Sequence, residues 1–149
     1  ALQLHQQLQK LHLTGRFEVP VDPDISLVPS GVNPVLQGDY QLYLAPRRPQ
    51  IYLAGLIGHP GEGPVLPAAG LREYWKKLDL LSGSDDTGAY LIAPSGKPEW
   101  IPVAIWNERH VEAMPGATLF VGFAPSVLPE QYQDLNKRML TLLANRMPK

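Results

Sequence analysis

The sequence predicts an α+β fold in which a single helix crosses one face of a mixed sheet. Three observations support this prediction: a helix-like stretch lies between two candidate hairpins, a strand-like run follows the second hairpin, and turn residues separate the short elements. The 16 prolines and 13 glycines are dispersed along the 149 residues, so they mark turns and not a low-complexity tract. The helix and the sheet would each bury one apolar side against the other.

Residues 1–39 are predicted to form a helix followed by an extended arm. Leu4, Leu8 and Leu11 have the spacing of one helical face, and Gly15 is suited to the helix end. The following sequence, VDPDISLVPSGVNPVLQGD, is rich in proline, glycine and aspartate. Such turn residues predict short extended segments.

Residues 40–124 are predicted to form the sheet domain. The order hairpin, helix, hairpin and final strand is the order of a β-grasp domain, and nine residues are expected in its core. The predicted elements are strands at 40–45 and 50–57, a loop at 59–70, a helix at 71–81, strands at 89–94 and 99–106, and a strand at 118–123. The predicted core residues are Ile51, Leu53, Leu71, Trp75, Leu91, Val103, Ile105, Leu119 and Val121.

Residues 125–149 are predicted to form an amphipathic helix. Pro129 suits the first helical turn, and the apolar stripe begun at Tyr132 and Leu135 is widened by Leu140 and Leu143. One interpretation docks this helix on its own domain. The other uses its second apolar edge for peripheral contact with a partner protein or a membrane surface, and predicts that Leu140 and Leu143 serve that contact.

Composition excludes several classes of function. The net charge is −1 and no lysine or arginine cluster exceeds a pair such as Arg47-Arg48, whereas a nucleic-acid-binding protein normally has a basic face. The absence of cysteine excludes disulfides, cysteine-ligated zinc and thiol catalysis. The four histidines lack metal-site spacing, and neither a nucleophile elbow nor a phosphate-binding loop occurs. The sequence therefore predicts no metal, no cofactor and no nucleic-acid partner.

The segment from Trp106 to His110 is the first candidate binding site. It combines an aromatic ring with the amide of Asn107, the carboxylate of Glu108 and the imidazole of His110. Sugars are commonly bound by an aromatic plate and several polar groups. The alternatives are a polar turn between two strands, or a polysaccharide-modifying hydrolase that uses Glu108 or His110.

Arg16 is the second candidate. It follows the predicted helix end, where a guanidinium could clamp a carboxylate such as that of a uronic-acid sugar. The alternative is that Arg16 covers the helix C-terminus or pairs with Asp22 or Asp24.

The succession WNERHVE, PGATLFVGF, LP and YQDLN, within residues 100–148, resembles the C-terminal half of the GfcC-type capsule biosynthesis family. The pattern Leu53-Ala54-Gly55, His59-Pro60-Gly61 and Ser84-Asp85 is similar to the β-grasp modules of polysaccharide export proteins. The likeness is strongest from Trp100 to Pro148, and Arg16 lies in another matching segment.

The resemblance implies a non-enzymatic accessory protein of capsule or exopolysaccharide biosynthesis and export in Gram-negative bacteria. Its expected partners are polysaccharide or outer-membrane polysaccharide export proteins. Its expected location is the periplasm, after removal of a signal peptide that this chain does not include. The family pattern names no catalytic residue, so no catalytic residue is expected. The candidate binding residues are Arg16, Trp106, Asn107 and His110.

Overall fold

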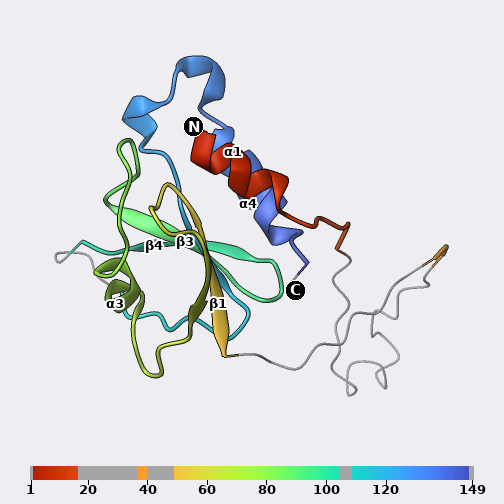
Figure 1. Cartoon of the computed structure of the whole chain (residues 1–149), viewed down its shortest axis with the longest axis horizontal. Coiled ribbons are helices and arrows are strands. Elements are labelled where there is room, and N and C mark those ends of the chain that lie inside the picture. Colours follow the sequence, from red (N-terminus) through yellow and green to blue (C-terminus); the bar gives the residue numbers. More distant parts are fainter. Residues whose placement is uncertain (1, 17–36, 40–48, 105–108, 148–149) are drawn as a thin grey trace, which may run out of the picture. The chain divides into compact units, whose positions relative to one another are not determined.

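A computed structural model describes residues 2–16, 37–39, 49–104 and 109–147 (Figure 1). The chain separates into two compact units, one formed by Ala1–Thr14 with Arg47–Lys149 and the other by Gly15–Pro46. The first unit contains all of the described helices and strands.

The described elements are short, as the many turn residues predict. In chain order they are α1 (Leu2–Gln9), β1 (Gln50–Gly55), β2 (Gly61–Pro64), α3 (Leu71–Trp75), β3 (Gly88–Ile92), β4 (Pro98–Pro102), β5 (Thr118–Val121), the 3₁₀ turns η1 (Pro125–Val127) and η2 (Glu130–Tyr132), and α4 (Leu135–Ala144).

The strands form one five-stranded mixed sheet with the order β2-β1-β5-β3-β4. The central pair β1 and β5 is parallel, with Leu53 opposite Leu119. The pairs β1–β2, β3–β5 and β3–β4 are antiparallel. The predicted α+β class is thereby confirmed, and the β-grasp assignment stays a prediction.

The partner of β1 differs from the expected one. The structure pairs β1 with β2, which lies inside the predicted loop, while the predicted strand at 40–45 lies outside the described residues. The β2 sequence, Gly-Glu-Gly-Pro, has neither β-branched residues nor an apolar alternation, so nothing local marks it as a strand. Its pairing is determined by the edge of β1 beside it. The helix predicted at 71–81 is also shorter, ending at Trp75.

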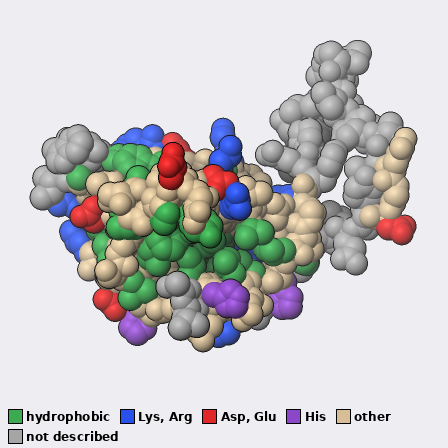
Figure 2. Space-filling view, turned by 90° about the horizontal axis from the view of Figure 1, so that it is seen from above, with side chains coloured by type: hydrophobic (Ala, Val, Ile, Leu, Met, Phe, Trp, Pro, Cys, Tyr) green, Lys and Arg blue, Asp and Glu red, His purple; other side chains and the backbone are tan. Residues whose placement is uncertain are grey.

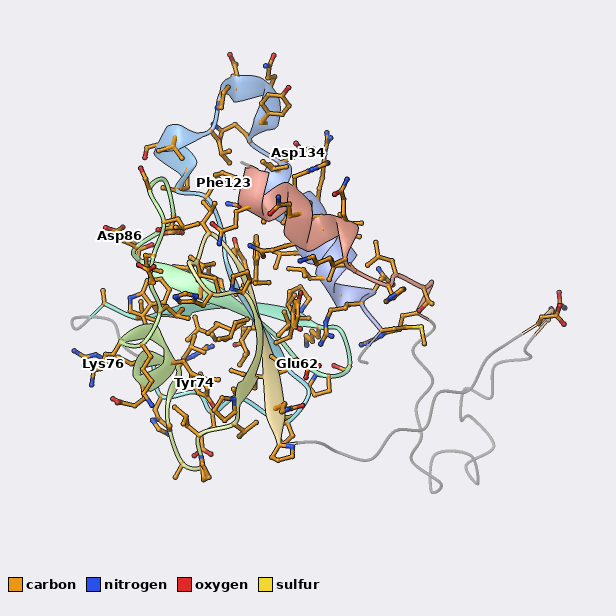
Figure 3. All side chains as sticks on the ribbon, viewed as in Figure 1. Glu62, Tyr74, Lys76, Asp86, Phe123 and Asp134 are labelled. Carbon is orange, nitrogen blue, oxygen red and sulfur yellow. The ribbon has the colours of Figure 1, made fainter. Side chains whose placement is uncertain are left out.

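The first hydrophobic cluster lies between α3 and one face of the sheet (Figure 1). Tyr74 extends from α3 into this layer (Figure 3), and its hydroxyl accepts a 2.6 Å hydrogen bond from the N–H of Leu66. Of the predicted core residues, Ile105 lies outside the described residues and the other eight belong to this cluster. Six of them are buried, and two, Leu53 and Trp75, are partly buried.

The second cluster covers the opposite face, where α1 and α4 lie side by side (Figure 1). Leu140 and Leu143 are only 9% and 4% exposed in this cluster, packed with Leu4 of α1 and Phe120 of β5. The prediction that both leucines serve a partner is therefore wrong. The sheet needs cover on both faces because all four residues of β5 are buried, a pattern typical of strands enclosed on two sides.

Two side-chain amides join these helices to the sheet. Gln7 Nε2 donates to the Gly55 carbonyl at 3.0 Å, and the Gly55 N–H donates to Gln7 Oε1 at 3.1 Å. Asn136 Nδ2 donates to the Phe123 carbonyl at 2.8 Å, and the Phe123 N–H donates to Asn136 Oδ1 at 2.9 Å. Each amide thus bonds to both the N–H and the carbonyl of a single residue. That residue lies at or just beyond the end of a central strand. These bonds fix where α1 and α4 lie on the sheet.

Candidate functional site

The loop that the sequence singles out is described only in part. Trp106, Asn107 and Glu108 lie outside the described residues. His110 has a side chain that is 64% exposed, and its Nε2 lies 3.5 Å from Glu112 Oε1. His110 thus makes a surface contact with Glu112. Its binding role stays a prediction.

Arg109, beside His110, donates from Nη2 to Glu99 Oε1 at 2.6 Å, and both side chains are half exposed. An exposed ion pair of this kind contributes at most about 1 kcal/mol. The pair joins the loop to β4. Neither side chain is buried in the way that catalytic acids and bases commonly are.

Arg16 is exposed and belongs to the second compact unit, Gly15–Pro46. Its role as a clamp for a carboxylate stays a prediction. Trp106 and Asn107 lie outside the described residues, and Arg16 and His110 belong to different units, so the predicted binding residues stay a prediction.

A pocket of about 540 Å³ opens elsewhere in the first unit, between α1, the β1–β2 hairpin and the residues that follow α4. This volume is within the range of about 300 to 1,000 Å³ that is typical of small-molecule sites. We call it the α1 pocket. It is lined by Gln3, Gln6, Gln7, Lys10, Leu11, His12, Tyr52, Pro60, Gly61, Glu62, Arg146 and Met147.

Backbone contacts between the ends of α1 and α4 shape one side of the α1 pocket. The segment after α1 runs antiparallel to the segment after α4, with Leu13 bridging Arg146. The Met147 N–H donates to the His12 carbonyl at 2.9 Å, and the Thr14 N–H donates to the Asn145 carbonyl at 3.1 Å. Chain ends that are far apart in sequence thereby supply neighbouring side chains to one site.

The β1–β2 hairpin supplies the other side of the α1 pocket. Tyr52 of β1 lies directly opposite Glu62 of β2, so both side chains share the sheet face that α1 and α4 cover. Figure 3 shows Glu62 on the opposite side of β1 from Tyr74. The guanidinium carbon of Arg146 lies 4.2 Å from the centre of the Tyr52 ring, a cation–π contact that orients this arginine.

Several polar side chains of the α1 pocket are available to a ligand. Gln6, Lys10, His12 and Glu62 are exposed, and among the described residues their side chains have neither a hydrogen-bond partner nor an ion-pair partner. Gln3, by contrast, uses its amide to donate to the Gly58 carbonyl at 2.9 Å. The α1 pocket therefore combines fixed structural amides with unengaged donors and acceptors.

Sequence reasoning missed the α1 pocket because its parts come from three distant segments. One signal was present: Gln7 is three residues beyond Leu4, on the apolar stripe of the helix, where a buried polar group requires a partner. Residue spacing alone could not identify Gly55 as that partner.

Within the described ranges, no cluster of three or more histidine, aspartate or glutamate side chains is arranged to hold a metal ion. Within those same ranges, no helix combines the length and the apolar character needed to cross a membrane.

Comparison with known proteins identifies the family. Residues 59–148 match the family described as capsule biosynthesis GfcC C-terminal, and residues 1–47 match capsule biosynthesis GfcC, N-terminal. The chain is also 43% identical over 145 residues to the protein named "Uncharacterized protein YjbG" of Escherichia coli strain K12. This similarity covers 97% of the chain and 59% of the length of that relative. The chain belongs to the GfcC capsule biosynthesis family.

Proposed function

We propose that the protein is a periplasmic, non-enzymatic accessory of capsule or exopolysaccharide biosynthesis and export. In this role it binds polysaccharide or a component of the outer-membrane export machinery. The observation that carries the proposal is the match to both the N-terminal and the C-terminal families, over residues 1–47 and 59–148.

We also propose that the sheet and α3 form a β-grasp domain. The support is the central parallel pair β1 and β5, flanked by antiparallel neighbours in the order β2-β1-β5-β3-β4. The helix α3 follows the first hairpin and covers one face of the sheet. In this arrangement α1 and α4 are additions that cover the second face.

Two surface features support a binding role. The α1 pocket has the size and the mixed polar and apolar lining of a small-molecule site. On the face seen from above, hydrophobic side chains gather near the middle, with charged side chains around them (Figure 2). Exposed apolar areas often mark contacts with other macromolecules. The α1 pocket therefore suits polysaccharide, and the apolar area suits a component of the export machinery.

Deleting the gene and measuring cell-surface polysaccharide tests the proposed role. The deletion is expected to reduce the surface polysaccharide, and the whole protein supplied from a plasmid is expected to restore it. Unchanged amount and chain length in the deletion strain would refute the role in capsule biosynthesis and export.

Incubating the purified whole protein with native polysaccharide tests the non-enzymatic part of the proposal. The chain length of the polysaccharide is expected to remain constant over time, as followed by size-exclusion chromatography. Time-dependent fragmentation that is lost in Glu108→Gln would instead establish the hydrolase alternative.

A further inference from the structure

We infer that the α1 pocket binds a segment of an acidic saccharide, meaning a sugar chain that carries carboxylate groups. This inference rests on the proposed function, and it adds both the place of binding and the chemical class of the ligand. The predicted loop at 106–110 is then not the primary saccharide site.

The shape of the α1 pocket suits a saccharide chain. A saccharide needs an open site, since its chain continues in both directions from the bound segment. The α1 pocket is open to solvent on the rim of the first unit, where the exposed side chains of Gln6 and Glu62 come from different elements. A chain can therefore be held between α1 and the β1–β2 hairpin without being enclosed.

The hydrogen-bonding groups of the α1 pocket match those of a sugar. Sugar hydroxyls both donate and accept, so they require a site with both kinds of group. The Gln6 amide supplies both, the Glu62 carboxylate accepts, and the His12 imidazole can do either. None of these three side chains is engaged by another described residue. Apolar atoms of Leu11 and Met147 complete the lining, as expected for the C–H faces of a sugar ring.

The charge of the α1 pocket favours an acidic ligand. The lining holds the cation Lys10 beside the carboxylate of Glu62, with Arg146 at the Tyr52 ring, in a protein whose net charge is −1. Arg146 is oriented by the Tyr52 ring, while Lys10 has no acidic partner among the described residues. The ammonium group of Lys10, which no described carboxylate neutralises, lies beside hydroxyl-binding groups and favours a carboxylated sugar over a neutral one.

Calorimetric titration of the whole protein tests the inference directly. The probes are a hexasaccharide of uronic-acid units and the same hexasaccharide with its carboxyl groups reduced to alcohols. The acidic probe is expected to bind more tightly than the reduced probe, and added salt is expected to weaken its binding. Equal affinity for the two probes, or no binding of the acidic one, would refute the assigned ligand class.

Substitutions at Gln6 of α1 and at Lys10, just after α1, locate the site. Lys10→Ala should weaken binding of the acidic probe by about ten-fold, the effect of losing one charge-assisted hydrogen bond. Gln6→Ala should weaken binding of both probes. The matched control is Lys97→Ala, which removes an exposed lysine in the turn between β3 and β4 and should change neither affinity. Wild-type affinity in both Lys10→Ala and Gln6→Ala would show that the saccharide binds elsewhere.

Complementation of the deletion strain separates the inference from the proposed function. Lys10→Glu combined with Gln6→Ala should fail to restore surface polysaccharide, whereas Lys97→Ala should restore it. Full restoration by the double variant would refute the α1 pocket and leave the role in capsule biosynthesis intact. A deletion strain with normal surface polysaccharide would instead refute the proposed function. Circular dichroism of the purified variants checks that each one is folded.

Discussion

At the scale of single residues, Gly55 is required by geometry. Its φ is +102°, in the region that side-chain-bearing residues rarely adopt, and an added Cβ would overlap the carbonyl of Val121 on β5. Gly55→Ala should therefore lower the free energy of unfolding by about 3 kcal/mol, from backbone strain and overpacking together. Chemical denaturation measures this loss. Gly15→Ala is the control, because its Cβ would meet no atom within 4 Å and its φ is not positive; equal midpoints for the two variants would contradict the account.

Gln7 gives a second prediction at this scale. The pairing of β2 with β1 stops at Leu53, so β2 offers no hydrogen-bond partner to the peptide groups of Gly55. The buried amide of Gln7 bonds to them instead. Gln7→Leu should cost about 1 to 3 kcal/mol for each peptide group left buried without a partner. Gln9→Leu, on an exposed position of the same helix, should change the denaturation midpoint little. A stable Gln7→Leu protein would mean that the amide contributes nothing to docking of α1.

At the scale of the elements, α4 is part of the core. Glutamate at both Leu140 and Leu143 should unfold the protein, since each buried leucine is worth about 2 to 5 kcal/mol against a usual total of about 5 to 15. Leu142→Glu, on the 38% exposed position between them, should leave the melting temperature nearly unchanged. A folded double variant in thermal melts would restore the interpretation that these leucines serve a partner.

The element α3 gives a pH-dependent prediction. The hydrogen bond from Lys76 Nζ to Glu73 Oε1, 2.7 Å long, lowers the pKa of Glu73 below its ordinary value of 4.5. Because the folded pKa is lowered, the stabilisation is present above pH 4.5 and is lost as the pH falls through the lowered pKa. Glu73→Gln should reduce the melting temperature slightly at neutral pH, and the difference should vanish in acid. Glu130→Gln is the exposed control; a difference that grew in acid would contradict the assignment.

Sequence reasoning predicted those elements whose own residues carry a pattern. The strands at β1, β3 and β5 and the helix at α3 follow from apolar runs and turn residues, so most of the predicted core is buried. The strand β2 has no such pattern because a neighbouring edge determines its conformation. The burial of Leu140 was missed for a similar reason: the apolar stripe of a helix does not specify which surface it meets.

The candidate site was less predictable than the fold. The cluster of aromatic and polar residues at 106–110 predicts a binding site there. The described part of this segment is exposed, and its charged side chains lie next to side chains of opposite charge. The α1 pocket combines residues from both ends of the chain with a hairpin, and only tertiary structure brings Lys10, Tyr52 and Arg146 together. Sequence proximity identified a local cluster, whereas a binding site depends on proximity in space.

At the scale of the whole molecule, the two sheet faces have different roles. The face under α3 holds the larger hydrophobic cluster. The other face is covered by α1 and α4, which hydrogen bonds fix to the ends of the parallel strands β1 and β5. The α1 pocket lies at the rim of this second layer, so its geometry depends on elements added to the sheet. Saccharide binding at the rim would leave the first cluster undisturbed.

Nuclear magnetic resonance of the ¹⁵N-labelled whole protein, titrated with the uronic-acid hexasaccharide, tests whether the α1 pocket binds an acidic saccharide. The largest shifts of backbone amide signals are expected at Lys10, His12, Glu62 and Met147, which line the α1 pocket. Shifts concentrated at residues 109–112, or the absence of any shift at saturating saccharide, would contradict this expectation.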